Sequence, residues 1–214
     1  MTAPEAAPKA AYSGLMRAIA GLYRQEAAAQ GPGAAMLGRA AAAIEALDLD
    51  RPRLPTGARK PVCRHMGAAL EEARLGPLAG LAQAFAAVER LSGWLQNPNY
   101  TEAAMGAAFL ANYGYVELVG PGRPYDSAAL LVGFLLLGPG AEYPEHLHEA
   151  EETYHVVAGA AEWKRAGSGW RVEPAGAAIH LRPNEAHAMR PGKKPLLALY
   201  CWAGAIGQAA RLSG

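Results

Sequence analysis

Short runs of apolar and β-branched residues, separated by glycine and proline, fill the chain from about residue 97 onward. Runs of five to eight residues with turn residues between them favour β-strands over helices. Many such strands in succession imply a β-sandwich or a small barrel. We expect strands at residues 115–119, 130–137, 152–157, 161–165, 178–181 and 196–202.

The N-terminal part of the chain has a different pattern, rich in alanine and without these short runs. Tyr12, Leu15, Met16, Ile19 and Leu22 follow the three-and-four spacing of one helical face. Further helices are expected at residues 34–47 and 67–95, the second interrupted at 76–77. The sequence therefore predicts an α+β protein, with a helical region at 1–95 that serves as scaffold and a β-domain at 96–214.

Composition and charge exclude several kinds of partner. The formal net charge is +1, and no basic run alternates with aromatic residues, so we expect no nucleic-acid binding. The longest apolar run, 128–137, is far shorter than the ~20 residues of a membrane span. The N-terminus lacks the pattern of a secretory signal, and Cys63 and Cys201 are expected to be reduced, buried thiols. We therefore expect a cytoplasmic protein.

The densest set of metal-ligand side chains lies between residues 140 and 159. His146 and His148 would share one face of a strand, and Glu152 and Tyr154 would share a face of the next. A hairpin between these strands would bring two imidazoles and a carboxylate together, and His187 could add a third imidazole. Such a set suits one divalent transition metal: zinc, iron(II), manganese, cobalt or nickel.

This segment resembles the first motif of the cupin family. Gly140, His146, His148, Glu152 and Gly159 occupy all five positions of its pattern: glycine, five residues, His-x-His, three residues, glutamate, six residues, glycine. The resemblance implies a cupin β-barrel, which is a double-stranded β-helix or jelly roll. Chance His-x-His pairs are common in strands, but the glutamate and both glycines favour a metal site.

The second cupin motif is only partly present. Pro183 and His187 match it, whereas Glu185 and Pro191 stand where glycine and asparagine are usual. His187 is therefore a weaker prediction than the other ligands.

Other ligand-type residues near the motif are assigned structural roles. Glu151 competes with Glu152 as the carboxylate ligand, but the motif spacing favours Glu152. His155 should face away from Glu152, as a packing or surface residue. His65 and His180 have no neighbouring ligands in the sequence.

A longer stretch resembles the cupin-type dimethylsulfoniopropionate (DMSP) lyases of marine bacteria. The matching residues are Trp94, Asn97-Pro-Asn-Tyr100, Asn112-Tyr-Gly-Tyr115, the run from Tyr143 to Tyr154, His187-Ala-Met and Tyr200-Cys-Trp202. The resemblance implies β-elimination of DMSP to dimethyl sulfide and acrylate.

Two tyrosines near the ligands are the candidate catalytic residues. A phenol with an ordinary pKa of ~10 is more easily ionised beside a divalent cation. The resemblance favours Tyr154 as the general base, with Tyr143 as the other candidate. Tyr143 and Trp202 could also bind the sulfonium through their aromatic rings, and Trp163 is expected to be a core residue.

Two other functions stay open at this point. One is a different metal-dependent cupin enzyme, such as an iron(II) dioxygenase acting on a small acid or thiol. The other is a non-enzymatic metal-binding cupin that acts as a sensor. The sequence also leaves the oligomeric state open, a homodimer included.

Overall fold

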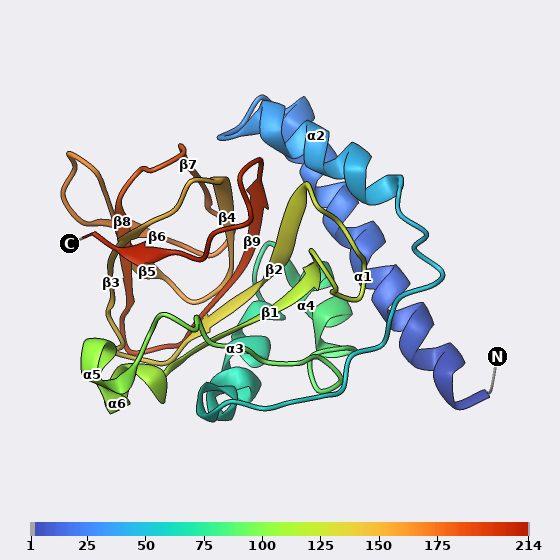
Figure 1. The fold of residues 1–214 in the computed structure, drawn as a ribbon, viewed down its shortest axis with the longest axis horizontal. Coiled ribbons are helices and arrows are strands. Elements are labelled where there is room, and N and C mark those ends of the chain that lie inside the picture. Colours follow the sequence, from blue (N-terminus) through green and yellow to red (C-terminus); the bar gives the residue numbers. More distant parts are fainter. Residues whose placement is uncertain (1–2, 214) are drawn as a thin grey trace.

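Two five-stranded antiparallel sheets pack face to face in the C-terminal part of the protein (Figure 1). The computed structural model describes residues 3–213. The first sheet has the order β1 (Tyr113–Val119), β2 (Leu130–Leu137), β9 (Leu196–Ala203), β4 (Glu151–Ala158) and β7 (Ala178–Leu181). The second has the order β10 (Arg211–Leu212), β3 (Tyr143–Leu147), β8 (His187–Pro191), β5 (Ala161–Arg165) and β6 (Arg171–Glu173).

The chain crosses between the sheets repeatedly from β2 to β9. The resulting orders, β2-β9-β4-β7 and β3-β8-β5-β6, are those of a jelly roll built from eight strands. This confirms the predicted α+β fold with a cupin barrel. All six predicted strands are present, and the strand expected to carry His146 and His148 corresponds to β3, which ends at Leu147, whereas β6, β8 and β10 were not predicted.

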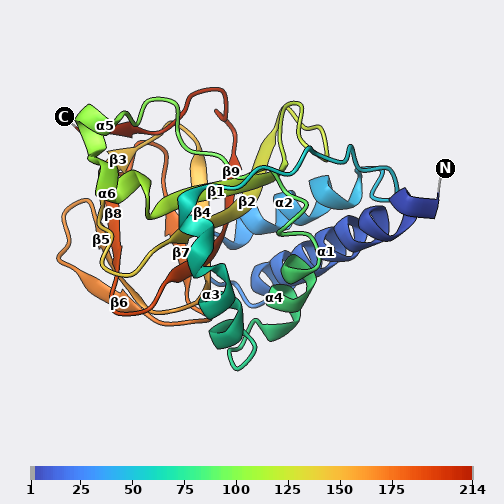
Figure 2. The same ribbon diagram turned by 90° about the horizontal axis from the view of Figure 1, so that it is seen from below.

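The helices up to residue 86 lie against one face of the first sheet, whereas the two short helices at 102–105 and 107–110 lie apart from them and pack on the core between the sheets (Figures 1 and 2). The predicted helix at 67–95 is divided near residues 76–77 as expected, but its second part ends at Ala86, and Leu95 instead pairs with Tyr115 of β1. The helices are α1 (Ala3–Ala28), α2 (Ala34–Glu45), η1 (Pro61–His65), α3 (Met66–Ala73), α4 (Ala79–Ala86), α5 (Glu102–Met105) and α6 (Ala107–Leu110).

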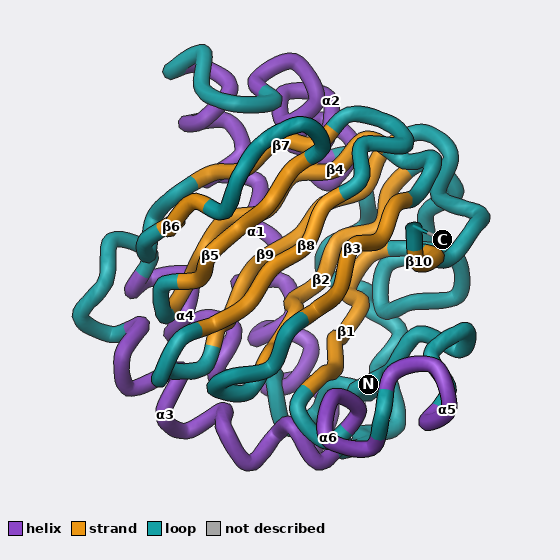
Figure 3. Tube along the Cα trace, turned by 90° about the vertical axis from the view of Figure 1, so that its left-hand side faces the viewer, coloured by secondary structure: helices purple, strands orange, loops and turns teal. Residues whose placement is uncertain are grey.

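Apolar cores cover both faces of the first sheet. One core joins the helices to the outer face, where Phe85 of α4 stacks on Phe134 of β2 with ring centroids 3.9 Å apart. The other fills the space between the sheets; Figure 3 shows the second sheet in front of the first. Strand β2 is therefore apolar along nearly its whole length, because neither of its faces meets water.

Among residues 3–213, none of the helices combines the length and the apolar character that crossing a membrane requires.

Candidate metal centre and cavity

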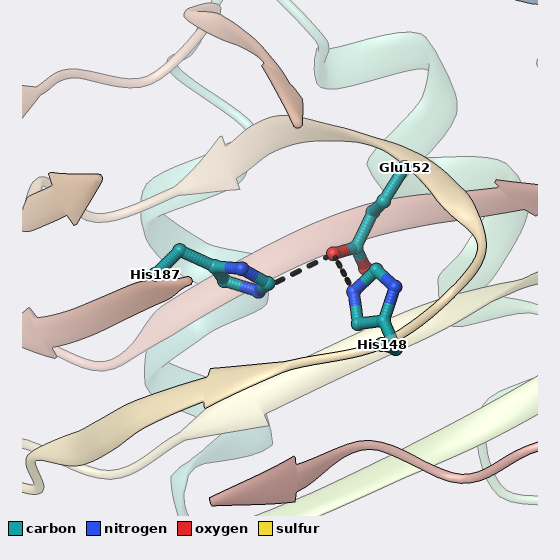
Figure 4. A group of neighbouring side chains, drawn as sticks. All are labelled: His148, Glu152 and His187. Carbon is teal, nitrogen blue, oxygen red and sulfur yellow. Dashed lines mark hydrogen bonds and ion pairs between the residues drawn. The ribbon is translucent and has the colours of Figure 1, made fainter. Parts of the chain in front are cut away.

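Three buried side chains converge between the two sheets. His148 follows the end of β3, Glu152 lies on β4, and His187 begins β8. One ligand atom from each lies within 4.8 Å of the others (Figure 4). The predicted hairpin is wrong: β3 pairs with β8 and β10, whereas β4 pairs with β7 and β9. The ligands meet because the two strands lie in opposite sheets that face each other.

Each of the three motif histidines has its Nδ1 against a backbone carbonyl. The distances are 2.8 Å from His146 to Pro144, 3.0 Å from His148 to Ala150, and 2.9 Å from His187 to Glu185. A carbonyl only accepts, so Nδ1 carries the hydrogen and Nε2 presents its lone pair. This is the tautomer that a metal-binding imidazole needs.

The contacts of Glu152 point to a cation. Its Oε2 lies 2.8 Å from Nε2 of His148 and 3.4 Å from Nε2 of His187. Nε2 of His187 has no hydrogen-bond partner among the described residues. Acceptors that face one another in a buried site require a shared proton or cation. Burial lowers the pKa of His187, which disfavours the proton. The donor set thus fits a divalent transition metal.

Trp202 holds the other oxygen of the carboxylate. Its Nε1–H donates to Oε1 of Glu152, and its ring stacks on His148 at 4.0 Å between centroids. Trp202 was predicted to bind substrate, and it does line the cavity described below. In the structure it also orients a carboxylate ligand, a role that the sequence analysis did not foresee.

His146 lies beside the three converging residues without joining them. Its ring is stacked on Tyr143 at 3.8 Å and lies 4.1 Å from the ring of His187, centroid to centroid. Burial lowers its pKa well below the usual value, which keeps the imidazole neutral. Its assignment as a fourth ligand stays a prediction.

The two candidate tyrosines are both buried and have different neighbours. Tyr154 lies on the same strand face as Glu152, and burial followed by the charge of Glu152 raises its pKa well above 10. Burial also raises the pKa of Tyr143, whose hydroxyl lies 3.0 Å from that of Tyr100. Of the two candidates, Tyr154 is therefore the one whose pKa is raised by the charge of Glu152.

A cavity of about 330 Å³ opens beside the ligand group. Sequence analysis overlooked Glu117 and Arg123 in its wall. The signal for Glu117 was available, because Tyr113, Tyr115 and Glu117 alternate on one face of a strand. The other lining residues are Asn97, Pro121, Leu131, Leu135, Tyr143, Glu152, Tyr154, Tyr200, Trp202 and 206–210.

The remaining histidines lie away from this group. His155 is buried on the face of β4 opposite to Glu152 and Tyr154, and its ring centroid lies 5.7 Å from that of Tyr23. His180 pairs with Glu151 at 2.8 Å, and His65 with Asn112 at 3.0 Å. Trp163 is buried beside Tyr154, in the core between the sheets.

Comparisons with known sequences single out one family. Residues 36–198 match the sequence model of a family described as dimethylsulfoniopropionate lyase. The putative dimethylsulfoniopropionate lyase DddL of Cereibacter sphaeroides is 34% identical over 147 residues, which cover 68% of this chain and 60% of the relative. The dimethylsulfoniopropionate lyase DddQ of Ruegeria pomeroyi is 30% identical over 131 residues, covering 61% and 64%. The matched regions thus span less than two thirds of either relative.

Solved structures agree with this match. A crystal structure described as that of the DMSP lyases RdDddP and RnDddQII superimposes with a TM-score of 0.73 at 26% identity, covering 97% of this chain and all of the other. The crystal structure of DddQ from Ruegeria pomeroyi gives 0.67 at 26% identity, covering 89% and 96%.

Proposed function

The chain belongs to the dimethylsulfoniopropionate lyase family, and from this premise we propose that it splits DMSP into dimethyl sulfide and acrylate by β-elimination. The observation that carries the proposal is the His148–Glu152–His187 group, whose Glu152 lines a partly open cavity together with Tyr154. The cavity volume suits a substrate of this size.

His148, Glu152 and His187 would hold one divalent transition metal, with His146 as the predicted fourth ligand. When bound, the metal supplies a positive charge that attracts the substrate carboxylate and acidifies the α-proton. Glu152 partly neutralises that charge, and Trp202 keeps the carboxylate oriented through Oε1.

Tyr154 is the proposed general base. Its phenolate oxygen takes the α-proton, the C–H electron pair becomes the new double bond, and the β-carbon–sulfur bond breaks. The sulfur keeps the electron pair of the broken carbon–sulfur bond and leaves as neutral dimethyl sulfide, and acrylate remains. Burial and Glu152 both oppose phenolate formation in the protein without a cation, so the ionised form depends on positive charge nearby.

Aromatic side chains of the cavity would bind the sulfonium through cation–π contacts of ~0.5–2 kcal/mol each. Tyr143 and Trp202 were predicted to make these contacts, but both stack on motif histidines, at the end of the cavity where the substrate carboxylate would bind. Both side chains line the cavity. The hydrogen bond between the hydroxyls of Tyr100 and Tyr143 would hold Tyr143 in place.

Headspace gas chromatography tests the proposal directly. Purified protein, loaded in turn with each candidate metal and given DMSP, should release dimethyl sulfide, also under strict anaerobiosis. No release with any metal would refute the lyase function, and a requirement for oxygen would favour the dioxygenase. Tyr154→Phe should keep its metal and lose turnover; if only Tyr143→Phe did so, Tyr143 would be the base.

A further inference from the structure

We propose that Glu117 recognises the sulfonium of the substrate, so that the cavity takes onium carboxylates in one orientation. The carboxylate would lie at the His148–Glu152–His187 end and the onium group toward Glu117. The inference rests on the proposed function, because it assumes that the substrate carries a carboxylate at one end and a sulfonium at the other.

Strand register places Glu117 opposite the ligand group. Glu117 pairs with Gly133, Gly133 with Tyr200, and Tyr200 with Tyr154, which forms one row across four strands of the first sheet. Strands lie ~4.8 Å apart, so three spacings put the backbones of Glu117 and Tyr154 ~14 Å apart. That distance leaves room for a short zwitterion between the two side chains.

Gly133 makes room for the Tyr200 ring in the middle of this row. A β-carbon there would lie 2.8 Å from the hydroxyl of Tyr200 and 1.9 Å from the carbonyl oxygen of Val116. Because residue 133 has no side chain, the phenol of Tyr200 can lie over β2, where its hydroxyl is 3.4 Å from the Val116 carbonyl oxygen. The wall of one cavity thus runs from the proposed base past Tyr200 to Glu117.

Two aromatic rings line the same cavity as Glu117. Tyr115 and Tyr200 touch edge to face, with ring centroids 6.4 Å apart and planes at 80°. A compact cation would therefore bind against their cavity side by cation–π attraction, not between them. The carboxylate of Glu117 in the same wall would supply the counter-charge.

Arg123 already pairs with Glu117, through its Nε and the Oε2 atom. Its side chain is 39% exposed, against 10% for Glu117, so the arginine approaches from the solvent side. Burial raises the pKa of Glu117 despite this partner. The alternative is that the pair only closes the cavity, in which case both residues should matter equally for every ligand.

Isothermal titration calorimetry separates these possibilities without turnover. The ligands are the trimethylammonium analogue of DMSP and propionate, which lacks the onium, with protein supplied with Zn²⁺. Glu117→Gln should weaken the analogue about tenfold, equivalent to about 1.4 kcal/mol, and change propionate less than about twofold. Arg123→Gln should not weaken the analogue. The control is Glu162→Gln, which breaks the Glu162–Arg190 pair outside the cavity.

Three results would overturn the inference. The first is that Glu117→Gln weakens the binding of the analogue and of propionate equally. The second is that Glu117→Gln and Arg123→Gln both weaken the binding of the analogue. The third is that Arg123→Gln loses propionate binding, which would reverse the orientation of the substrate in the cavity. With DMSP, Glu117→Gln should raise KM and leave kcat nearly unchanged. A protein that bound the analogue through Glu117 but released no dimethyl sulfide would refute the proposed function and not this inference.

Discussion

Both carboxylate oxygens of Glu152 have polar partners. Trp202 donates to Oε1, while Oε2 faces the Nε2 atoms of His148 and His187. A carboxylate held in this way cannot rotate away from a bound metal ion without breaking a buried hydrogen bond. The residue that fixes it should therefore matter for metal affinity as well as for substrate binding.

Trp202→Phe tests this role, because it removes the N–H donor and keeps an aromatic ring over His148. We expect metal affinity to fall about 10–100-fold, as is usual when the partner of a ligand is lost. Titration with a competing chelator measures it. Trp163→Phe is the matched control, since Nε1 of Trp163 has no hydrogen-bond partner among the described residues. Equal affinities in the two variants would contradict the role.

His155 predicts a pH dependence of stability. Burial lowers its pKa from 6.5 to about 4. Between these values the unfolded chain takes up a proton that the folded protein excludes, so stability is lost as the pH falls. The contribution is about 2 kcal/mol between pH 7 and pH 5. Urea unfolding at both pH values should show a smaller loss for His155→Leu; equal losses would exclude His155 as the cause.

At the scale of elements, the two glycines that flank the motif differ in their surroundings. Both have positive φ, +71° at Gly140 and +82° at Gly159. A β-carbon at Gly140 meets open space, whereas at Gly159 it would lie 2.3 Å from the carbonyl oxygen of Pro195. The turn between β4 and β5 therefore depends on glycine for space as well as for conformation.

Alanine at each glycine should separate these two effects. Gly140→Ala carries only the cost of the left-handed conformation, about 1–2 kcal/mol. Gly159→Ala must also move the backbone near Pro195, so we expect a loss of stability at least twice as large. Thermal or urea unfolding measures both. Similar losses would show that the contact with Pro195 relaxes easily.

Two of the predicted strands, β2 and β9, have long apolar runs. The runs are long because both faces of the first sheet are covered. β8 was missed and β3 was expected only from its His-x-His pair, because each contains proline and β3 is irregular between Tyr143 and His146. Whether β3 and β4 pair or face each other is a property of the whole barrel, which local alternation does not determine.

The convergence of His148, Glu152 and His187 was predictable for a related reason. His148 and Glu152 belong to one continuous motif, and His187 joins them although its own motif is degenerate; that the three hold a metal stays a prediction. Glu117 was not found: alternation indicates that it shares a strand face with Tyr113 and Tyr115, but its position along the cavity depends on the register of β1 against β2 and β9. A sequence without an alignment does not give that register.

At the scale of the molecule, one core joins the helical region to the barrel. Residues of α1, α2 and α4 pack with those of β1, β2 and β9 in a single cluster. The boundary at residue 95 stays a prediction from the sequence, but the two regions share their buried surface. We therefore expect them to unfold together.

Phe85→Ala tests this coupling at the stack between α4 and β2. Loss of the ring should cost about 3–5 kcal/mol. Helix content by circular dichroism and tryptophan fluorescence should fall in one coincident transition, shifted equally by the substitution. Leu75→Ala, at a side chain 91% exposed, should change little. Two separate transitions would show that the regions fold independently.

The three candidate ligands come from both layers of the barrel, since His148 directly follows β3 and His187 begins β8 in the second sheet, whereas Glu152 lies on β4 in the first. An ion bound by all three would link the two sheets directly. Its removal should let the sheets separate more often, and amide hydrogen exchange would then speed up in β4 and β8 together. Activity and the rate at which the two sheets separate would thus depend on free metal concentration in the same way.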